Sequence, residues 1–207
     1  MLKYSKIWER ALDLKIIVSG TPGVGKHTVS KELSKLLGEI PILDINKAIL
    51  SENLLVPSIH KNEVDIEKTS NLLKLMLSSN KYADSIIIGH LAPYVVDPLL
   101  VDFAVVLRRS PYELRQIYES RSYSEKKIHD NLISEILGII SYDFLEKFNK
   151  TDVAELEINE SVSPSVSAQK IVEMYFDKNL REFGMTDWFP VVQNDPQMLK
   201  FLLWIKK

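Results

Sequence analysis

Residues 20–28 read GTPGVGKHT, a glycine-rich run that nearly matches the phosphate-binding pattern G-x-x-x-x-G-K-[ST]. The backbone N–H groups of such a loop point inward toward a phosphate, and the helix that follows adds the positive end of its dipole. Lys26 supplies a point charge for the β and γ phosphates of a nucleotide, and Thr28 can reach the α phosphate. The residues predicted to bind nucleotide phosphate here are Gly23, Val24, Gly25, Lys26, His27 and Thr28.

One position departs from this pattern. His27 stands where a hydroxyl would ligand Mg²⁺, and an imidazole is a poor ligand for that ion. His27 either points away, leaving the metal to phosphates and water, or contacts phosphate when it is protonated. The second metal-supporting acid should end a neighbouring strand, but SIIIGH offers Ile88 there. Asp44 is the remaining candidate, acting through water, so we expect ATP to bind with altered Mg²⁺ coordination.

The elements that must position these residues alternate between strands and helices. Apolar runs predict strands at Leu14–Ser19, Ile40–Asp44, Ser85–His90, Phe103–Arg109 and, more weakly, Val153–Ile158. Helical patterns follow the loop as far as Leu37 and recur at Ile66–Leu77, Pro111–Glu119, Ser124–Phe148 and Ser165–Phe176, with a polar stretch through Asn62 predicted to be irregular. This alternation predicts an α/β fold with a parallel sheet flanked by helices. Ligands bind such sheets at the carboxyl ends of their strands, where Gly20, Asp44, His90 and Arg108 should converge.

Four further residues are candidates for phosphate chemistry. Arg121 begins a predicted lid and would close over the transferred phosphoryl group, where charge must be neutralised. One of Arg108 and Arg109 is expected to contact nucleotide and the other a surface carboxylate, and their order stays open. Lys47 stands one turn beyond Asp44 and could bind the acceptor phosphate, although Asp44 also suits the N-cap of a helix.

Composition sets broad limits on the protein class. The 207 residues suit one domain, and the net charge of −2 gives no general basic field for nucleic acid. There is no cysteine, which excludes disulfides and thiolate metal sites. No run reaches the roughly 18 apolar residues that span a bilayer, so we expect a soluble, cytoplasmic protein without a membrane partner. The C-terminal run QMLKFLLWIKK is expected to dock as a helix, with partner binding as the alternative, and His60 and His129 are expected at the surface.

Three motifs in order resemble one family. They are the loop GTPGVGKHT, the strand SIIIGHLAP and the segment LRRSPYELRQIYESRSYSEKKIHDNLISEI. Together they are similar to the adenylate-kinase-like P-loop ATPases that include the coilin-interacting nuclear ATPase protein and its archaeal adenylate kinase relatives. The likeness covers roughly residues 14–176, and FGMTDWFP at 183–190 resembles a G-x-V-D-W segment of the archaeal members.

The resemblance implies a P-loop nucleoside monophosphate kinase fold with a short lid, in one domain over residues 1–207. The lid would span about 119–131, an acceptor-binding insert about 45–65 and a C-terminal extension about 180–207. The implied activity is ATP + AMP ⇌ 2 ADP with ATP hydrolysis, using AMP or another nucleoside monophosphate. The implied cellular role is small ribosomal subunit maturation, with a ribosomal platform protein and pre-ribosomal RNA as partners.

The family motifs also assign residues. The family loop reads G-T-P-G-V-G-K-T-T, and its third strand ends in an acid, one residue and histidine, so His27 and Ile88 depart while His90 matches and is implied to position water or the γ phosphate. A hydrogen-bonded core histidine is the alternative reading of His90. The family lid, R-G-Y-x-x-x-K, is matched by Arg121, Tyr123 and Lys127, with Ser122 in place of glycine and Asp130 and Asn131 following. Because the departures fall where the metal is controlled, a catalytically weakened, nucleotide-gated ribosome assembly factor is the alternative function.

Overall fold

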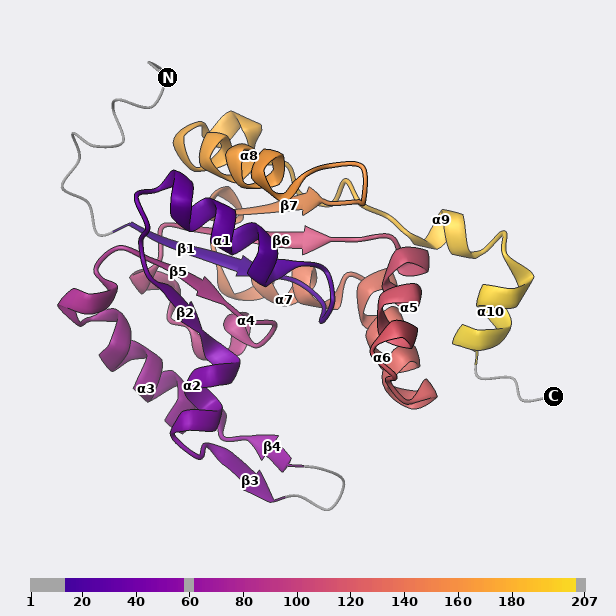
Figure 1. Ribbon diagram of the computed structural model, residues 1–207, viewed down its shortest axis with the longest axis horizontal. Helices are drawn as coiled ribbons and strands as arrows, with labels where there is room; N and C mark the ends of the chain where they lie inside the picture. Colours follow the sequence, from indigo (N-terminus) through magenta and orange to yellow (C-terminus); the bar gives the residue numbers. More distant parts are fainter. Residues whose placement is uncertain (1–13, 58–61, 204–207) are drawn as a thin grey trace.

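Five parallel strands form the central sheet of the computed structural model, which describes residues 14–57 and 62–203 (Figure 1). Their order across the sheet is β2-β5-β1-β6-β7, and every neighbouring pair is parallel. Both faces of the sheet are covered, which is why the strands are nearly continuous apolar runs. The strands are β1 (Lys15–Ser19), β2 (Ile42–Asp44), β5 (Ser85–Ile88), β6 (Phe103–Arg108) and β7 (Val153–Glu157). All five predicted strands are confirmed, each trimmed by one or two residues.

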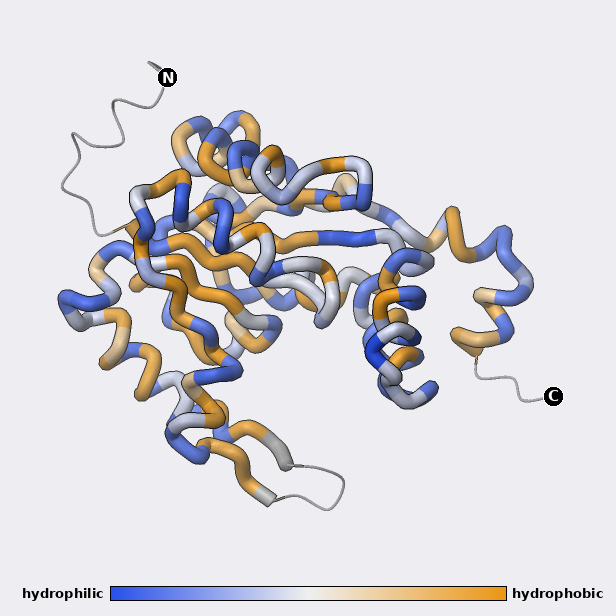
Figure 2. Tube along the Cα trace, viewed as in Figure 1, coloured by the Kyte–Doolittle hydropathy of each residue, from blue (hydrophilic) through white to orange (hydrophobic). Residues whose placement is uncertain are grey.

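Helices cover the two faces of the sheet and enclose two apolar cores. Side chains of β1 alternate between them: Ile16 and Val18 lie in one core, and Ile17 lies in the other. The first core is closed by α1 (Lys26–Leu36) and α8 (Pro164–Phe176), and the second by α3 (Ile66–Leu77), α4 (Ala92–Val95) and α7 (Ile139–Lys147). In Figure 2 the strands are largely orange along their length, as expected for buried apolar residues. None of the helices in residues 14–57 and 62–203 is long and apolar enough to cross a membrane.

The predicted helix Ser124–Phe148 is two helices in the structure. It divides into α6 (Glu125–Ile136) and α7 at Gly138, whose φ of 62° lies in the left-handed region. A Cβ at Gly138 would lie 3.4 Å from Nη1 of Arg108, so a side chain there would press on a buried guanidinium. The break between α6 and α7 therefore allows these two helices to lie close to β6.

The stretch predicted to be irregular between β2 and α3 contains regular structure. Helix α2 (Ile45–Ser51) begins directly after β2, and a hairpin of β3 (Leu55–Pro57) and β4 (Asn62–Val64) follows. Asp44 caps α2, because its Oδ1 accepts a hydrogen bond from the backbone N–H of Lys47 at 3.2 Å. The N-cap reading of Asp44 is confirmed, and His60 lies outside the described residues.

The C-terminal segment docks against the helices that carry the predicted lid. Helix α9 (Phe189–Val192) leads to α10 (Pro196–Leu202), which packs on α6 and buries Met198. The guanidinium of Arg115 on α5 (Pro111–Ser120) lies 4.7 Å from the Phe201 ring centroid. His129 was predicted at the surface but is half-buried, with Nε2 2.8 Å from the Leu202 carbonyl oxygen. Docking of the terminal helix is confirmed for the part of the chain that the structure describes.

Candidate functional site

The glycine-rich loop joins the end of β1 to the start of α1, as a phosphate-binding loop requires. Gly23 has a φ of 94°, and a Cβ there would lie 2.7 Å from Cε1 of Tyr118. The Tyr118 hydroxyl donates a hydrogen bond to the Pro22 carbonyl oxygen. Helix α5 therefore packs so closely behind the loop that only glycine fits at position 23. Val24 is fully buried, so only its backbone is available to a ligand.

Lys26 is buried at the first position of α1. Its Nζ donates to the carbonyl oxygens of Gly20 at 2.7 Å and Thr21 at 3.0 Å. Burial lowers the pKa of Lys26 to about 8, and the carboxylates of Glu135 and Asp44 only partly oppose this shift. The amine is therefore charged at neutral pH but close to its titration range.

A cavity of about 580 Å³ opens over the loop. It brings together Lys26 and Thr28 from the loop, His90 from the end of β5, and Arg121 from the predicted lid. The other predicted lid residues that line it are Tyr123, Lys127, Asp130 and Asn131. Strand ends and lid thus face one space, which has the basic side chains and the backbone loop needed to hold a polyphosphate.

His90 enters this cavity as a neutral ring. Burial, reinforced by the charge of Lys26, lowers its pKa to about 4. The turn that carries His90 is held in place because the Ser19 hydroxyl donates to the Gly89 carbonyl oxygen at 2.8 Å. At neutral pH His90 therefore offers one hydrogen-bond donor and one acceptor rather than a positive charge.

The lid begins at a defined helix end. The N–H of Tyr123 donates to the Tyr118 carbonyl oxygen and that of Ser122 to Glu119, the two bonds of a Schellman motif with Arg121 as the last half-helical residue. The rings of Tyr118 and Tyr123 stack with centroids 5.6 Å apart, and Lys127 Nζ lies 3.7 Å from the Tyr123 centroid. Arg121 is therefore presented at the cavity by a helix end that is itself anchored to the loop.

Ser122 occupies the left-handed position of this motif, with a φ of 54°. A non-glycine residue there costs roughly 1–2 kcal/mol, whereas glycine loses about 0.5–1 kcal/mol more backbone entropy on folding. We therefore expect Ser122→Gly to raise the free energy of unfolding by up to about 1 kcal/mol in urea titrations. Ser120→Gly, in the last helical turn, should lower it by a similar amount, and a loss of stability in both variants would contradict this explanation.

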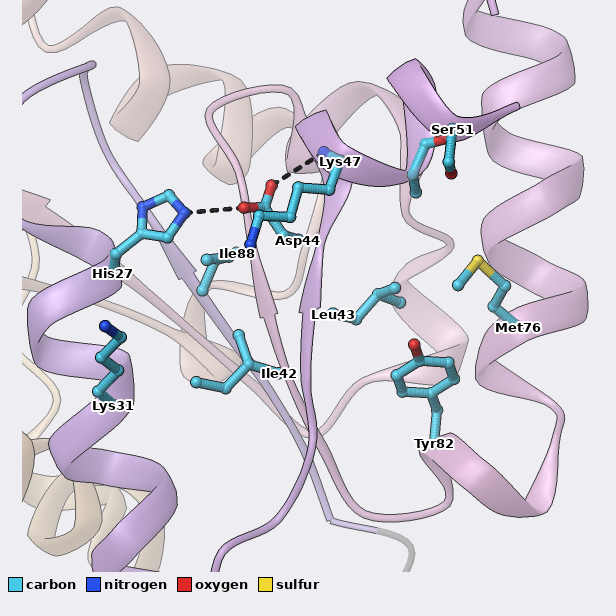
Figure 3. Close-up of a pocket in the computed structure, with 11 residues that line it drawn as sticks. His27, Lys31, Ile42, Leu43, Asp44, Lys47, Ser51, Met76, Tyr82 and Ile88 are labelled. Carbon is cyan, nitrogen blue, oxygen red and sulfur yellow. Dashed lines mark hydrogen bonds and ion pairs between the residues drawn. The ribbon is translucent and has the colours of Figure 1, made fainter. Parts of the chain in front are cut away.

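His27 and Asp44 form a direct pair beside the loop cavity. Nε2 of His27 lies 2.8 Å from Oδ2 of Asp44, with 59 % and 10 % of the two side chains exposed. Figure 3 shows His27 and Lys31 on α1 facing Asp44 and Lys47 across a second cavity of about 350 Å³. Asp44 and Lys47 line this outer cavity rather than the loop cavity, and His27 lines both.

The donor set around His27 fits Mg²⁺ poorly. That ion takes oxygen ligands in near-octahedral geometry, but Ile88, which pairs with Asp44 across β2 and β5, offers none. Asp44 already accepts hydrogen bonds from Lys47 and His27. Within residues 14–57 and 62–203, no group of three or more His, Cys, Asp or Glu side chains is arranged to hold a metal ion.

Arg108 corrects the expectation that this side chain contacts nucleotide. Only 4 % of its side chain is exposed, and its guanidinium is bound by two buried carboxylates. Its Nε lies 2.9 Å from Glu135 Oε1, and its Nη1 lies 2.5 Å from Glu155 Oε1. Arg109 instead pairs with Glu113 at 2.7 Å, as expected of the arginine that contacts a carboxylate. Neither arginine lines the loop cavity.

Glu135 is a positioning residue that sequence reasoning missed. Its carboxylate accepts from the Thr21 hydroxyl at 2.6 Å and from Trp188 Nε1 at 3.1 Å, in addition to Arg108. It thereby ties the loop to β6 and to the C-terminal segment. The signal was available: Glu135 lies three residues after Leu132 on the apolar face of α6, where a carboxylate needs a buried partner.

Comparison with known proteins gives a consistent family. A family model described as an AAA domain matches residues 16–138. A protein named “Putative adenylate kinase” from Methanococcus maripaludis is 30 % identical over 183 residues, which cover 84 % of this chain and 94 % of the relative. One with the same name from Methanocaldococcus jannaschii is 29 % identical over 178 residues, covering 84 % and 93 %.

The fold is also shared with solved kinase structures. Shikimate kinase from Bacteroides thetaiotaomicron superposes with a TM-score of 0.55 at 17 % identity, covering 79 % of this chain and 99 % of that enzyme. At this identity the likeness concerns the fold alone. The predicted P-loop kinase fold, a parallel sheet flanked by helices, is thereby confirmed.

Proposed function

This chain belongs to the AAA domain family and to the P-loop kinases that its archaeal relatives represent, and from this membership we propose that it is a nucleoside monophosphate kinase of adenylate kinase type. ATP is the proposed phosphoryl donor and AMP the proposed acceptor, with slow ATP hydrolysis as a side reaction. The relatives' name supports the acceptor class, since the shared fold alone does not distinguish nucleotide from shikimate as acceptor.

One observation carries the proposal. The loop cavity holds Lys26 and the first N–H groups of α1 on one side and Arg121 with Lys127 on the other. Phosphoryl transfer needs in-line positioning and neutralisation of charge on the transferred group, and little covalent chemistry from the protein. Cationic groups on both sides of one cavity meet that need.

We assign the steps to these side chains. Lys26 and the loop N–H groups bind the β and γ phosphates of ATP, and Thr28 reaches the α phosphate. An oxygen of the AMP phosphate attacks the γ phosphorus while the bond to the β–γ bridging oxygen breaks, which leaves two ADP molecules. Arg121 neutralises charge on the phosphoryl group in transit, and neutral His90 orients the γ phosphate or a nearby water.

Acceptor binding is assigned to the segment that follows β2. Lys47 and Asp44 line the outer cavity together, and α2 with the β3–β4 hairpin forms the proposed acceptor-binding insert. Lys47 would bind the acceptor phosphate, and His27, which lines both cavities, would lie between donor and acceptor. A divalent metal bound to the nucleotide would add charge neutralisation, and Asp44 could orient its water ligands.

ADP formation from ATP, with and without AMP and with divalent metal present, tests the proposed function. We expect AMP-stimulated ADP formation in the parent, and a loss in kcat of about 10²-fold in Arg121→Ala because the group that neutralises transition-state charge is removed. Lys126→Ala is the matched control: it removes a lid cation that does not itself line the cavity and that pairs with the exposed carboxylate of Asp130. The absence of AMP stimulation, or equal losses in both variants, would contradict the proposal.

A second candidate follows from His27 and Ile88, neither of which offers Mg²⁺ an oxygen ligand. In it the protein binds ATP, turns it over poorly, and passes the nucleotide state to a partner. A small-subunit ribosomal platform protein or pre-ribosomal RNA would be that partner, on the family resemblance alone. ATP binding without AMP-stimulated turnover, together with nucleotide-dependent co-sedimentation with small ribosomal subunits, would favour this candidate.

A further inference from the structure

We propose that His27 and Asp44 complete, with the phosphate oxygens of a bound nucleotide, a site for a borderline divalent transition metal such as Mn²⁺, Co²⁺ or Zn²⁺. The proposal rests on the proposed function only in requiring that a nucleotide polyphosphate occupies the loop cavity. It concerns which metal accompanies that nucleotide. It assigns His27 as a metal ligand at the position where the usual loop has a hydroxyl.

The position of His27 carries the first step. It follows Lys26 in the first turn of α1, the place from which a loop side chain reaches a metal on the β and γ phosphates. With 59 % of its side chain exposed, the imidazole is accessible to a metal. Because His27 lines both the loop cavity and the outer cavity, a metal bound to it would be shared between loop and Asp44.

The geometry of the pair carries the second step. Two ligand atoms on one metal, each at 2.0–2.2 Å, lie about 3.0 Å apart when they meet the metal at a right angle and about 3.4 Å apart at the tetrahedral angle. The 2.8 Å between Nε2 of His27 and Oδ2 of Asp44 is within a few tenths of an ångström of the first separation. Asp44 is already oriented, because its Oδ1 accepts from Lys47 N–H and β2 pairs with β5 at Ile88. An exposed histidine needs only a small rotation to admit the ion.

Donor chemistry carries the third step. Imidazole nitrogen suits Zn²⁺, Cu²⁺, Fe²⁺ and their neighbours, whereas Mg²⁺ takes oxygen and dehydrates reluctantly. One nitrogen and one carboxylate are too few to hold a metal alone, and among the described residues no third such side chain joins them. Metal binding at this pair should therefore depend on nucleotide. The competing structure is the direct His27–Asp44 contact, which as a plain ion pair would exclude the metal.

The test compares metals in the full-length protein. ATP affinity is measured by titration calorimetry with Mg²⁺, Mn²⁺ and Co²⁺, and the visible absorption of Co²⁺ is recorded with and without a non-hydrolysable ATP analogue. The variants are His27→Thr, which restores a hydroxyl, and His27→Gln, which keeps a long polar side chain. Lys31→Thr is the matched control, because Lys31 lines the same outer cavity from the same helix without being placed as a ligand.

We expect the parent to bind ATP about tenfold or more tightly with Mn²⁺ or Co²⁺ than with Mg²⁺. That ratio should fall toward one in both His27 variants and persist in Lys31→Thr. In the parent we also expect a Co²⁺ absorption band that appears only with nucleotide present and is lost in the His27 variants. Equal metal ratios in parent and His27 variants, or a band independent of His27, would overturn the metal site and leave the ion pair. A parent that binds ATP neither in the presence of any of these metals nor in their absence would overturn the proposed function as well, so the two failures are distinguishable.

Discussion

Replacing Arg108 with methionine is expected to lower the free energy of unfolding by about 3–5 kcal/mol, because it leaves two buried carboxylates without their cation. Glu135 and Glu155 have 1 % and 4 % of their side chains exposed, so water cannot replace the guanidinium. Burial alone would lower the pKa of Arg108, but the charges of Glu135 and Glu155 outweigh it and raise that pKa. Arg108, Glu135 and Glu155 are therefore held together by strong mutual attraction in a site without solvent.

The measurement is urea unfolding of the parent and two variants, followed by circular dichroism. Arg109→Met is the matched control, since Arg109 is the next residue and pairs with Glu113 where 15 % and 24 % of the two side chains are exposed. Partly exposed pairs contribute about 0–1 kcal/mol, so this variant should remain close to the parent. Similar losses in the two variants, or a loss under about 1 kcal/mol in Arg108→Met, would contradict the buried network.

Arg108 also shows where sequence reasoning stops. The apolar run and its strand end were predictable, because a buried parallel strand has a distinctive composition and its end points to a known edge. The partner of the side chain was not, because Glu135 lies 27 residues later and reaches β6 only when the chain turns at Gly138. Side-chain direction at a strand end is set by packing between elements, which no local pattern encodes.

Elsewhere in the molecule, elements with a clear local pattern were likewise predictable, whereas short strands and contacts between distant elements were not. Helix α3 was predicted at its observed bounds because its apolar face repeats. In the structure Asp65 also caps it, accepting from Lys68 N–H at 3.0 Å. The β3–β4 hairpin was missed because three-residue strands carry little periodicity. Within the candidate site, Lys26, His27, Thr28, His90 and Arg121 were predicted and line one cavity. The His27–Asp44 contact was not predicted, since it joins two elements that meet only at the sheet edge.

Above pH 8, the affinity for ATP is expected to fall by up to about tenfold per pH unit, because Lys26 must be charged to bind the β and γ phosphates. Burial places the pKa of Lys26 at about 8 in the free protein. At pH 7 and below the amine is almost fully protonated, so affinity should be nearly flat there and begin to fall as the pH approaches 8. Above it, each binding event must take up a proton, which calorimetry in buffers of different ionisation enthalpy detects directly.

Stability without nucleotide should move in the opposite direction over the same range. The pKa of Lys26 is lowered from its ordinary value of 10.5 to about 8 on folding, so the unfolded chain binds more protons between these two values. The free energy of unfolding therefore rises with pH through that window and is unchanged by this group below pH 8. Opposite pH trends in affinity and stability would be specific to a buried amine that binds phosphate.

Lys26→Met separates this explanation from other titrations in the protein. We expect the variant to bind ATP more weakly at pH 7 and to lose the fall in affinity above pH 8, whereas Lys47→Met, altered only in the outer cavity, should retain that fall. Terminal phosphates titrate near pH 6, and burial brings the pKa of His90 to about 4, so neither group contributes in this window. A fall in affinity that persists unchanged in Lys26→Met would assign the titration to another group, and Lys26 would then be no more than a packed side chain of the loop.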